Sequence, residues 1–335
     1  MWRSDDLIRR NRRIFHEELD GFLPPRILDF HVHIFPREAL PEGESYICGG
    51  HPIAQYTIGD YETNMAAVLP GRSVSAVIFG SPNPRYNTAL NNRYVAECAR
   101  DGRYTPFRLF DPLADTPESL SADVAAGLFR GIKPYLSFAR RENPDDVRIP
   151  DMLPEWAVEI AAAHKLIIML HVPRSLRLAD PDNRKHVVDY AAKYPDASIV
   201  LAHVGRAYFL KNVTGSLDAF IGLPNVYIDL AMLNNWEVLE YTFRRFPSER
   251  ILFASDIPIA LAPGKSVEIN DQYTYVTPVP WKLSISDEHG KLVFTSFLYE
   301  ELRAIRKAVE RLGLGNDFVR DVFFNNGMRL LGRLP

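Results

Sequence analysis

Short apolar segments, rich in β-branched and aromatic residues, occur eight times along this chain and alternate with segments of helical periodicity. Such alternation is typical of parallel strands, because each parallel connection must cross over the sheet and usually does so as a helix. Eight units of this kind predict a (β/α)8 TIM barrel, an α/β fold. An open, doubly wound sheet has the same alternation and is the alternative. The segments are 27–33, 74–80, 104–109, 129–136, 166–172, 198–204, 225–231 and 251–256.

The 335 residues, of which 47% are hydrophobic, suffice for one large core, and no Gly/Ser-rich linker divides them. We expect one barrel domain over residues 26–335, preceded by a helical extension over residues 1–25 with its polar helix at 4–20. SFLYEELRAIRKAVERLGL and FVRDVFFNNGMRLL predict two closing helices. Long loops should follow the first and last strands, and the last loop, 257–296, should contain a hairpin over 282–294 and act as a lid or an oligomer contact.

Composition narrows the class of protein. The net charge is −3 with both signs scattered, which argues against nucleic acid as a partner. The charged N-terminus does not resemble a secretory signal, and no segment approaches the roughly 18 apolar residues of a membrane span. We expect a cytoplasmic protein with a small-molecule substrate and leave a homo-oligomer open. The two cysteines, Cys48 and Cys98, form no C-x-x-C pair, so a metal would need His and carboxylate ligands.

The stretch ILDFHVHIFP, residues 27–36, contains two histidines one residue apart. Because successive side chains of a strand point to opposite faces, we assign Leu28, Phe30 and Val32 to the helix side of the barrel. His31 and His33, together with Asp29, then point inward. The two histidines lie about 6.6 Å apart along the strand, close enough to bind one ion.

The same alternation turns further polar side chains inward: Lys133 in 129–136, His171 in 166–172, His203 in 198–204 and Asp256 in 251–256. We expect each to lie at the C-terminal end of its strand, where barrel enzymes build their active sites. Burying so many polar groups without partners would be costly. Their convergence therefore predicts a metal site. In 198–204 the residues assigned to the outside are Val200, Ala202 and Val204.

The ordered set DFHVH, GIKPY, MLHV, VLAHVGR, ASDIP and FFNNGMRLL, spread over about residues 26–332, resembles the amidohydrolase superfamily, and within it the amidohydrolase-related branch of hydrolases and non-oxidative decarboxylases. The resemblance implies one divalent ion, most often zinc, with His31, His33, His171 and Asp256 as ligands. His203 would lie beside the ion as a polarising or proton-transferring group. Ile257 departs from the pattern, since many relatives have an aromatic residue there.

The number of metal ions per chain depends on the chemical state of Lys133. Some members of the superfamily carry a carbamylated lysine at this strand position that bridges two ions, in which case His171 and His203 would bind the second. Unmodified, its ammonium group would repel a cation, and it would bind a substrate anion or pair with a carboxylate. We expect one ion.

The function that follows is a metal-dependent hydrolase of a small, carboxylate-bearing amide, ester or lactone. Asp256 would take the proton of the attacking water and return it to the leaving group. Arg174 and Arg206 would bind a substrate carboxylate, or else form ion pairs at the rim. Asp29 would orient a histidine or make a structural hydrogen bond, and Asp229 also faces inward without an assigned role. A decarboxylase of an aromatic or muconate-like acid and a non-catalytic metal-binding protein are the alternatives.

Overall fold

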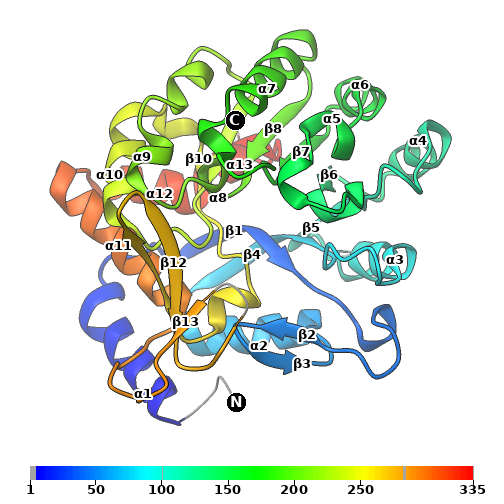
Figure 1. Ribbon diagram of the computed structural model, residues 1–335. Helices are drawn as coiled ribbons and strands as arrows, with labels where there is room; N and C mark the ends of the chain where they lie inside the picture. The colour runs from blue at the N-terminus through cyan, green and yellow to red at the C-terminus, as the bar shows by residue number, and fades with distance from the viewer. Residues whose placement is uncertain (1–4, 100, 282–283, 335) are drawn as a thin grey trace.

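In the computed structural model, which describes residues 5–99, 101–281 and 284–334, eight parallel strands form a barrel surrounded by helices (Figure 1). Each predicted apolar segment overlaps one of these strands, so the predicted (β/α)8 fold is confirmed. Hydrogen-bonded neighbours follow in chain order. The strands are β1 (Arg26–His33), β4 (Ser73–Phe79), β5 (Tyr104–Phe110), β6 (Gly131–Pro134), β7 (Ile167–Leu170), β8 (Ser198–Leu201), β9 (Val226–Asp229) and β10 (Ile251–Leu252).

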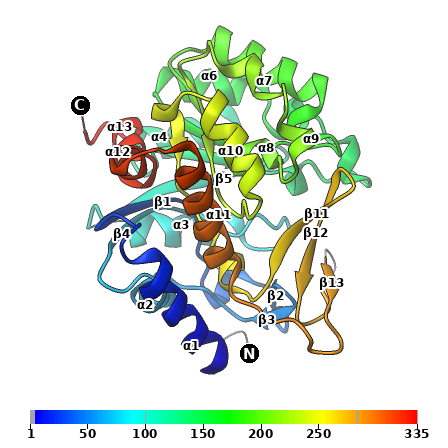
Figure 2. The ribbon, with the colours of Figure 1, turned by 90° about the vertical axis from the view of Figure 1, so that its left-hand side faces the viewer.

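Helices follow the strands along the chain and cover the outside of the barrel (Figures 1 and 2). Many begin at a side chain that accepts a hydrogen bond from the first turn, such as Thr57 before α2 and Ser296 before α11. The main helices are α2 (Ile58–Val68), α3 (Thr88–Cys98), α4 (Pro117–Ala125), α6 (Glu155–Ala163), α7 (Pro181–Lys193), α10 (Trp236–Arg245) and α11 (Phe297–Leu312). None of the helices in the described part of the chain has the length and apolar character needed to span a membrane.

The first and last strands meet and close the ring. The amide of Phe30 donates to the carbonyl of Phe253 (3.0 Å), and the amide of Asp256 donates to the carbonyl of His31 (2.9 Å). Closure therefore continues past the end of β10, and it sets Asp256 directly beside His31.

The barrel interior corrects the alternation that we predicted for two strands. One buried apolar cluster contains residues of β1, β4, β5, β7, β8 and β10, and only side chains that point into the barrel can meet from all of these strands. Leu28, Phe30, Val200 and Ala202 belong to this cluster, so their predicted outward orientation was wrong. For β7 and β10 the predicted alternation was correct, because Met169 and Leu252 are interior and Ile168 is not.

Two backbone irregularities explain why the histidines still reach the interior. Between Asp29 and Val32 the register of β1 against β4 shifts by one residue, a bulge that lets His31 follow the interior residue Phe30 on the same side. After β8 the backbone turns left-handed, with φ of 57° at His203 and 64° at Arg206, which re-aims His203 inward. Neither irregularity follows from simple alternation.

The two ends of the barrel are covered differently (Figure 2). The last helices, α12 (Asn316–Arg320) and α13 (Asn326–Leu330), lie at one end, where Phe324 and Met328 pack against the interior cluster. The hairpin β2–β3 (Tyr46–Cys48 and His51–Ile53) and the sheet β11–β13 lie together on the opposite side. This opposite side holds the C-terminal strand ends, where the polar residues gather.

The loop after β10 contains a hairpin, but not where we predicted it. Strands β11 (Lys265–Ile269) and β12 (Gln272–Thr277) are antiparallel, and β13 (Ser284–Ser286) runs parallel to β12. Residues 287–294 contain no strand, so the hairpin predicted over 282–294 was wrong; its residues 282 and 283 lie outside the described part. Alternation alone cannot tell which neighbouring segment a short strand will pair with.

The N-terminal extension is helical as predicted. Helix α1 (Asp5–Ile14) continues into a π-helical turn (Phe15–Leu19), while residue 4 lies outside the described part. Leu7, Ile14 and Phe15 are buried, so the polar helix packs through one apolar stripe. Residues 5–19 therefore lie against the barrel domain.

Candidate metal centre

Three histidines from β1 and the turn after β8 surround the carboxylate of Asp256. The Nε2 atom of His33 lies 3.2 Å from Asp256 Oδ1, that of His31 lies 3.6 Å from the same oxygen, and that of His203 lies 3.9 Å from Oδ2. One ligand atom each from His31, His203 and Asp256 fall within 4.8 Å of one another. This compact group includes His203, which the resemblance had placed beside the metal instead of among its ligands.

Each of these histidines is held in one orientation through its other ring nitrogen. All three Nδ1 partners are oxygens that only accept hydrogen bonds, so we assign the ring proton to Nδ1 and a free lone pair to Nε2. The partners are Asp229 Oδ2 for His31 (3.0 Å), the Gly80 carbonyl for His33 (2.8 Å) and the Ala231 carbonyl for His203 (3.0 Å).

The centre is therefore rich in acceptors. Three Nε2 lone pairs face a carboxylate, and such groups repel one another unless a proton donor or a cation lies between them, as Lys133 Nζ does beside His31 Nε2 (3.3 Å). Burial raises the pKa of Asp256, but the positive charge that His31, His33 and His203 carry when protonated lowers it by more, so the pKa lies well below its usual range. Nitrogen and carboxylate donors in this number suit a divalent ion such as zinc, so the residues present fit a metal.

Burial favours the neutral form of His31 and of His203, which is the form that binds a metal. Burial is the main factor that lowers the pKa of His31 and of His203, and the charge of Lys133 lowers both further. Neutral imidazoles bind a metal without first losing a proton. Solvent reaches mainly Asp256, whose side chain is 18% exposed, whereas that of His31 is 1% exposed.

His171 lies next to this group but outside its compact part. Its ring is 5.4 Å from that of His203 and packs against the ring of Tyr135 at 4.2 Å. Its Nδ1 is buried and has no hydrogen-bond partner among the described residues. A buried ring nitrogen that has no hydrogen-bond partner and lies beside other donor atoms is available to bind a metal. This observation supports the predicted ligand role of His171, which stays a prediction.

Lys133 is fully buried, and its Nζ lies 3.3 Å from His31 Nε2. Burial lowers its pKa to about 8, against the opposing effect of Asp229 and Asp256. The amine therefore points at a predicted ligand and not toward solvent. The predicted contact of Lys133 with a substrate anion therefore stays a prediction, and so does the carbamate.

Asp229 is the residue whose role the sequence analysis did not assign. Its Oδ2 accepts from His31 Nδ1, and its Oδ1 accepts from the amides of His203 (2.7 Å) and Ala231 (3.2 Å). One carboxylate thus orients two histidines of the centre. Its inward position at the end of a strand was the available signal.

We expect Asp229→Asn to weaken metal binding or activity by about 10–100-fold, the usual cost of losing a group that orients a ligand. An amide can present only one acceptor oxygen, so either the His31 contact or the two backbone contacts must be lost. Zinc titration against a competing chelator measures the effect. Asp218→Asn, at a surface pair with Arg245, is the control; equal zinc affinity in both variants would contradict the role of Asp229.

Of the two roles predicted for Asp29, the structure shows the structural hydrogen bond and not the contact with an imidazole. Its carboxylate accepts from the amide (2.9 Å) and the hydroxyl (2.5 Å) of Ser255, and the hydroxyl of Tyr61 on α2 lies 3.5 Å away. Burial raises the pKa of Asp29 to about 7. Asp29 therefore makes the structural contact that joins β1 to the segment after β10.

The two arginines predicted to bind substrate, Arg174 and Arg206, differ in whether a carboxylate pairs with their charge. Arg174 Nε donates to Asp180 Oδ2 (2.8 Å), so its charge is paired, which favours the rim ion pair. Arg206 donates to the carbonyl of Val172 (3.0 Å), and no carboxylate of the described residues lies within ion-pair distance of it. After burial, its charge is the largest factor that lowers the pKa of His171, so Arg206 lies close to the centre.

Comparisons with known proteins agree with this architecture. The chain resembles an amidohydrolase from Burkholderia multivorans with bound zinc, at 16% identity over 92% of this chain and 99% of that chain, with a TM-score of 0.58. It also resembles a 2,6-dihydroxybenzoate decarboxylase complexed with 2,6-dihydroxybenzoate, at 14% identity over 92% and 100% of the chains (TM-score 0.54). A probable 2-pyrone-4,6-dicarboxylic acid hydrolase from Acinetobacter baumannii with citric acid bound is 15% identical over 91% and 99% of the chains (TM-score 0.54).

At these identities the structural likeness shows the shared fold. No curated protein matches the chain significantly. A family model described as amidohydrolase, however, matches residues 28–332, which include all of the barrel except the first two residues of β1. With this match, and with histidines and an aspartate gathered at the barrel mouth, the chain belongs to the amidohydrolase family.

Proposed function

We propose that this protein is a metal-dependent hydrolase of a small, carboxylate-bearing amide, ester or lactone. The observation that carries the proposal is the acceptor-rich centre, in which oriented histidine nitrogens and the solvent-reaching Asp256 carboxylate converge. A bound divalent ion would lower the pKa of a coordinated water to about 7 and so supply hydroxide at neutral pH. His31, His33, His171 and Asp256 would hold the ion, with His203 close to it.

Asp256 and His203 would accept the proton of the attacking water and transfer it to the leaving group. Asp256 stays ionised at neutral pH, because its histidine neighbours hold its pKa low after burial has raised it. His203 Nε2, 3.9 Å from Asp256 Oδ2, is unprotonated at rest because its Nδ1 carries the ring proton. A proton taken from water can therefore reside on either atom before it passes to the leaving group. Once protonated, His203 Nε2 can donate to the oxygen that becomes negative during attack.

The position of Arg206 supports the proposal that the substrate carries a carboxylate. Its guanidinium lies near His171 and Tyr135, and among the described residues it has no carboxylate partner. A bidentate contact with a substrate carboxylate would neutralise this charge and fix the distance of the reacting carbon from Asp256.

A specific observation also favours decarboxylation of an aromatic acid as a second candidate. Aromatic rings line the centre: Tyr135 packs on His171 at 4.2 Å, and Tyr208 lies 6.0 Å from His203. Planar rings prefer such surroundings. The two candidates share every ligand and differ in whether the proton is delivered to a leaving group or to a ring carbon.

Metal analysis and a substrate panel test the proposal together. Protein purified without chelators should contain about one divalent ion per chain, and two ions would support carbamylated Lys133. The metal-loaded protein, the chelator-treated protein and His31→Asn are then incubated with lactones, N-acyl amino acids and aromatic acids, while acid release and carbon dioxide release are followed separately.

We expect metal-dependent acid release that is absent from His31→Asn. Carbon dioxide release without acid release would make the decarboxylase the better account. Metal binding with turnover of neither class would favour a non-catalytic protein, and a centre that cannot be loaded with zinc would refute the proposal.

A further inference from the structure

Glu301 is a buried carboxyl group on α11 that the proposed function does not use. Its side chain is completely buried, its Oε2 accepts from the amide of Met232 (2.8 Å), and its Oε1 has no partner among the described residues. Burial raises its pKa well above the usual range. Burying a carboxyl group that makes a single hydrogen bond costs free energy of folding, so the contact with Met232 indicates a role beyond packing.

The contact leads directly to the candidate centre. The amide of Met232 and the carbonyl of Ala231 belong to the same peptide unit, and that carbonyl accepts from His203 Nδ1 (3.0 Å). Glu301 and His203 therefore bind the two ends of one peptide group. Met232 has φ of 61°, a left-handed conformation that a side-chain-bearing residue rarely adopts, so contacts on both sides must hold the peptide in place.

Other side chains anchor the chain on either side of the Ala231–Met232 peptide. Asp229 Oδ1 accepts from the amide of Ala231 (3.2 Å), which fixes the preceding peptide unit. Asn234 Nδ2 donates to the carbonyl of Phe297 at the start of α11 (3.1 Å), which fixes the chain two residues further on. Between these anchors, the amide of Leu233 donates to the carbonyl of Leu230 (3.1 Å) and closes a turn around the Ala231–Met232 peptide. Glu301 binds the amide of this central peptide and so favours the observed orientation of the peptide plane.

We propose that Glu301 is a positioning residue for His203 and acts through the Ala231–Met232 peptide. Hydrogen bonds at the two ends of an amide polarise one another, so the contact at the Met232 amide makes the Ala231 carbonyl a better acceptor. This keeps the ring proton of His203 on Nδ1 and directs the Nε2 lone pair toward Asp256. The carboxyl group touches neither the ion nor the substrate.

Histidine NMR tests this inference without any substrate. In metal-free protein labelled with ¹⁵N-histidine, two-bond correlations report which ring nitrogen carries the proton, and His203→Asn assigns the signal. We expect the Nδ1–H tautomer in the wild type. In Glu301→Leu, which keeps the volume and removes the acceptor, we expect a mixture shifted toward Nε2–H. An Nε2–H tautomer in the wild type, or an unchanged tautomer in Glu301→Leu, would overturn the inference.

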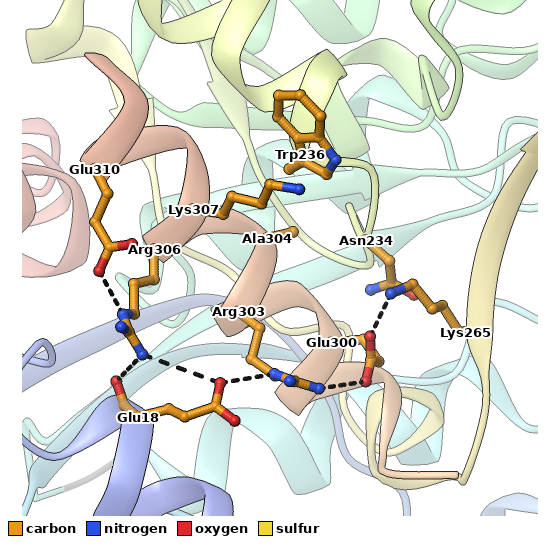
Figure 3. A pocket seen from close by; sticks show the side chains of 10 residues that line it. All are labelled: Glu18, Asn234, Trp236, Lys265, Glu300, Arg303, Ala304, Arg306, Lys307 and Glu310. Atoms are coloured by element: carbon orange, nitrogen blue, oxygen red, sulfur yellow. Dashed lines mark hydrogen bonds and ion pairs between the residues drawn. The ribbon is translucent and has the colours of Figure 1, made fainter. Parts of the chain in front are cut away.

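Two variants separate positioning from general loosening of α11. Glu301→Gln is nearly isosteric with the neutral acid and keeps an acceptor for the Met232 amide, so it should preserve the wild-type tautomer. Glu300→Leu changes the next residue of the helix, which instead lines an outer pocket of about 430 Å³ and pairs there with Lys265 and Arg303 (Figure 3). The same tautomer shift in Glu300→Leu would refute a specific role for Glu301.

The inference rests on the proposed function only for its effect on turnover. With a substrate from the panel, Glu301→Leu should lower kcat about tenfold and leave KM and metal content unchanged, and Glu301→Gln should restore kcat. If no substrate is found, the proposed function fails while the tautomer measurement still decides the inference. If Glu301→Leu does not fold, Glu301→Asp, which withdraws the acceptor by one methylene group, is measured in the same way.

Discussion

Replacement of His203 by asparagine is expected to lower kcat by a factor of about 10²–10⁴, the usual contribution of a group that transfers a proton. Asparagine retains a polar side chain but cannot take up and release a proton as His203 Nε2 can, at 3.9 Å from Asp256 Oδ2. Metal content should stay at the wild-type value if His31, His33, His171 and Asp256 are the ligands. Turnover and elemental analysis of one preparation measure both effects.

His186→Asn is the matched control, because the same substitution is made at a histidine of α7 that pairs with an exposed aspartate, Asp182, and packs near Tyr190. It should change neither kcat nor metal content. Loss of metal in His203→Asn would make His203 a ligand, as its place in the compact donor group permits. Retention of both metal and activity would show that His203 has no part in the reaction.

Asp256→Asn is expected to abolish turnover, with a loss of at least about 10²–10⁴ in kcat, and to remove the stabilisation that zinc provides. A ligand that binds only the folded state adds roughly 4 kcal/mol when its free concentration is about 1,000 times its Kd. The wild-type protein should therefore melt at a higher temperature with zinc than without it. The variant should show no such rise.

The metal-free variant offers a further check. The amide of asparagine can donate to the Nε2 lone pairs of His31 and His33, which the carboxylate can only face as another acceptor. We therefore expect metal-free Asp256→Asn to melt no lower than metal-free wild type. Asp182→Asn, at an exposed carboxylate, should behave like wild type with and without zinc. A zinc-dependent rise in Asp256→Asn equal to that of wild type would exclude Asp256 as a ligand.

Local periodicity explains why so much of the barrel could be predicted. Strands and helices repeat every two and about 3.6 residues, so each apolar segment reports its own structure without knowledge of its partners. The same reasoning found His31, His33, His171, His203 and Asp256, because polar residues at the C-terminal ends of parallel strands meet at one mouth.

The failures share one cause. The outward orientation predicted for Leu28 and Ala202 was wrong because a bulge in β1 and a left-handed turn after β8 interrupt the alternation. The hairpin after β10 was misplaced because the pairing of β11 with β12 depends on which segments lie side by side. Such irregularities are set by contacts with other elements and leave little trace in the local pattern.

The sequence by itself determined the class of fold, the order of its elements and the residue types available for a metal, since these follow from local patterning. Only the tertiary structure decided that Asp229, 198 residues from His31, orients that histidine, and that Glu301 reaches the peptide that holds His203. Hydrogen bonds between distant segments depend on how the barrel closes and how its helices pack. No periodicity within one segment encodes them.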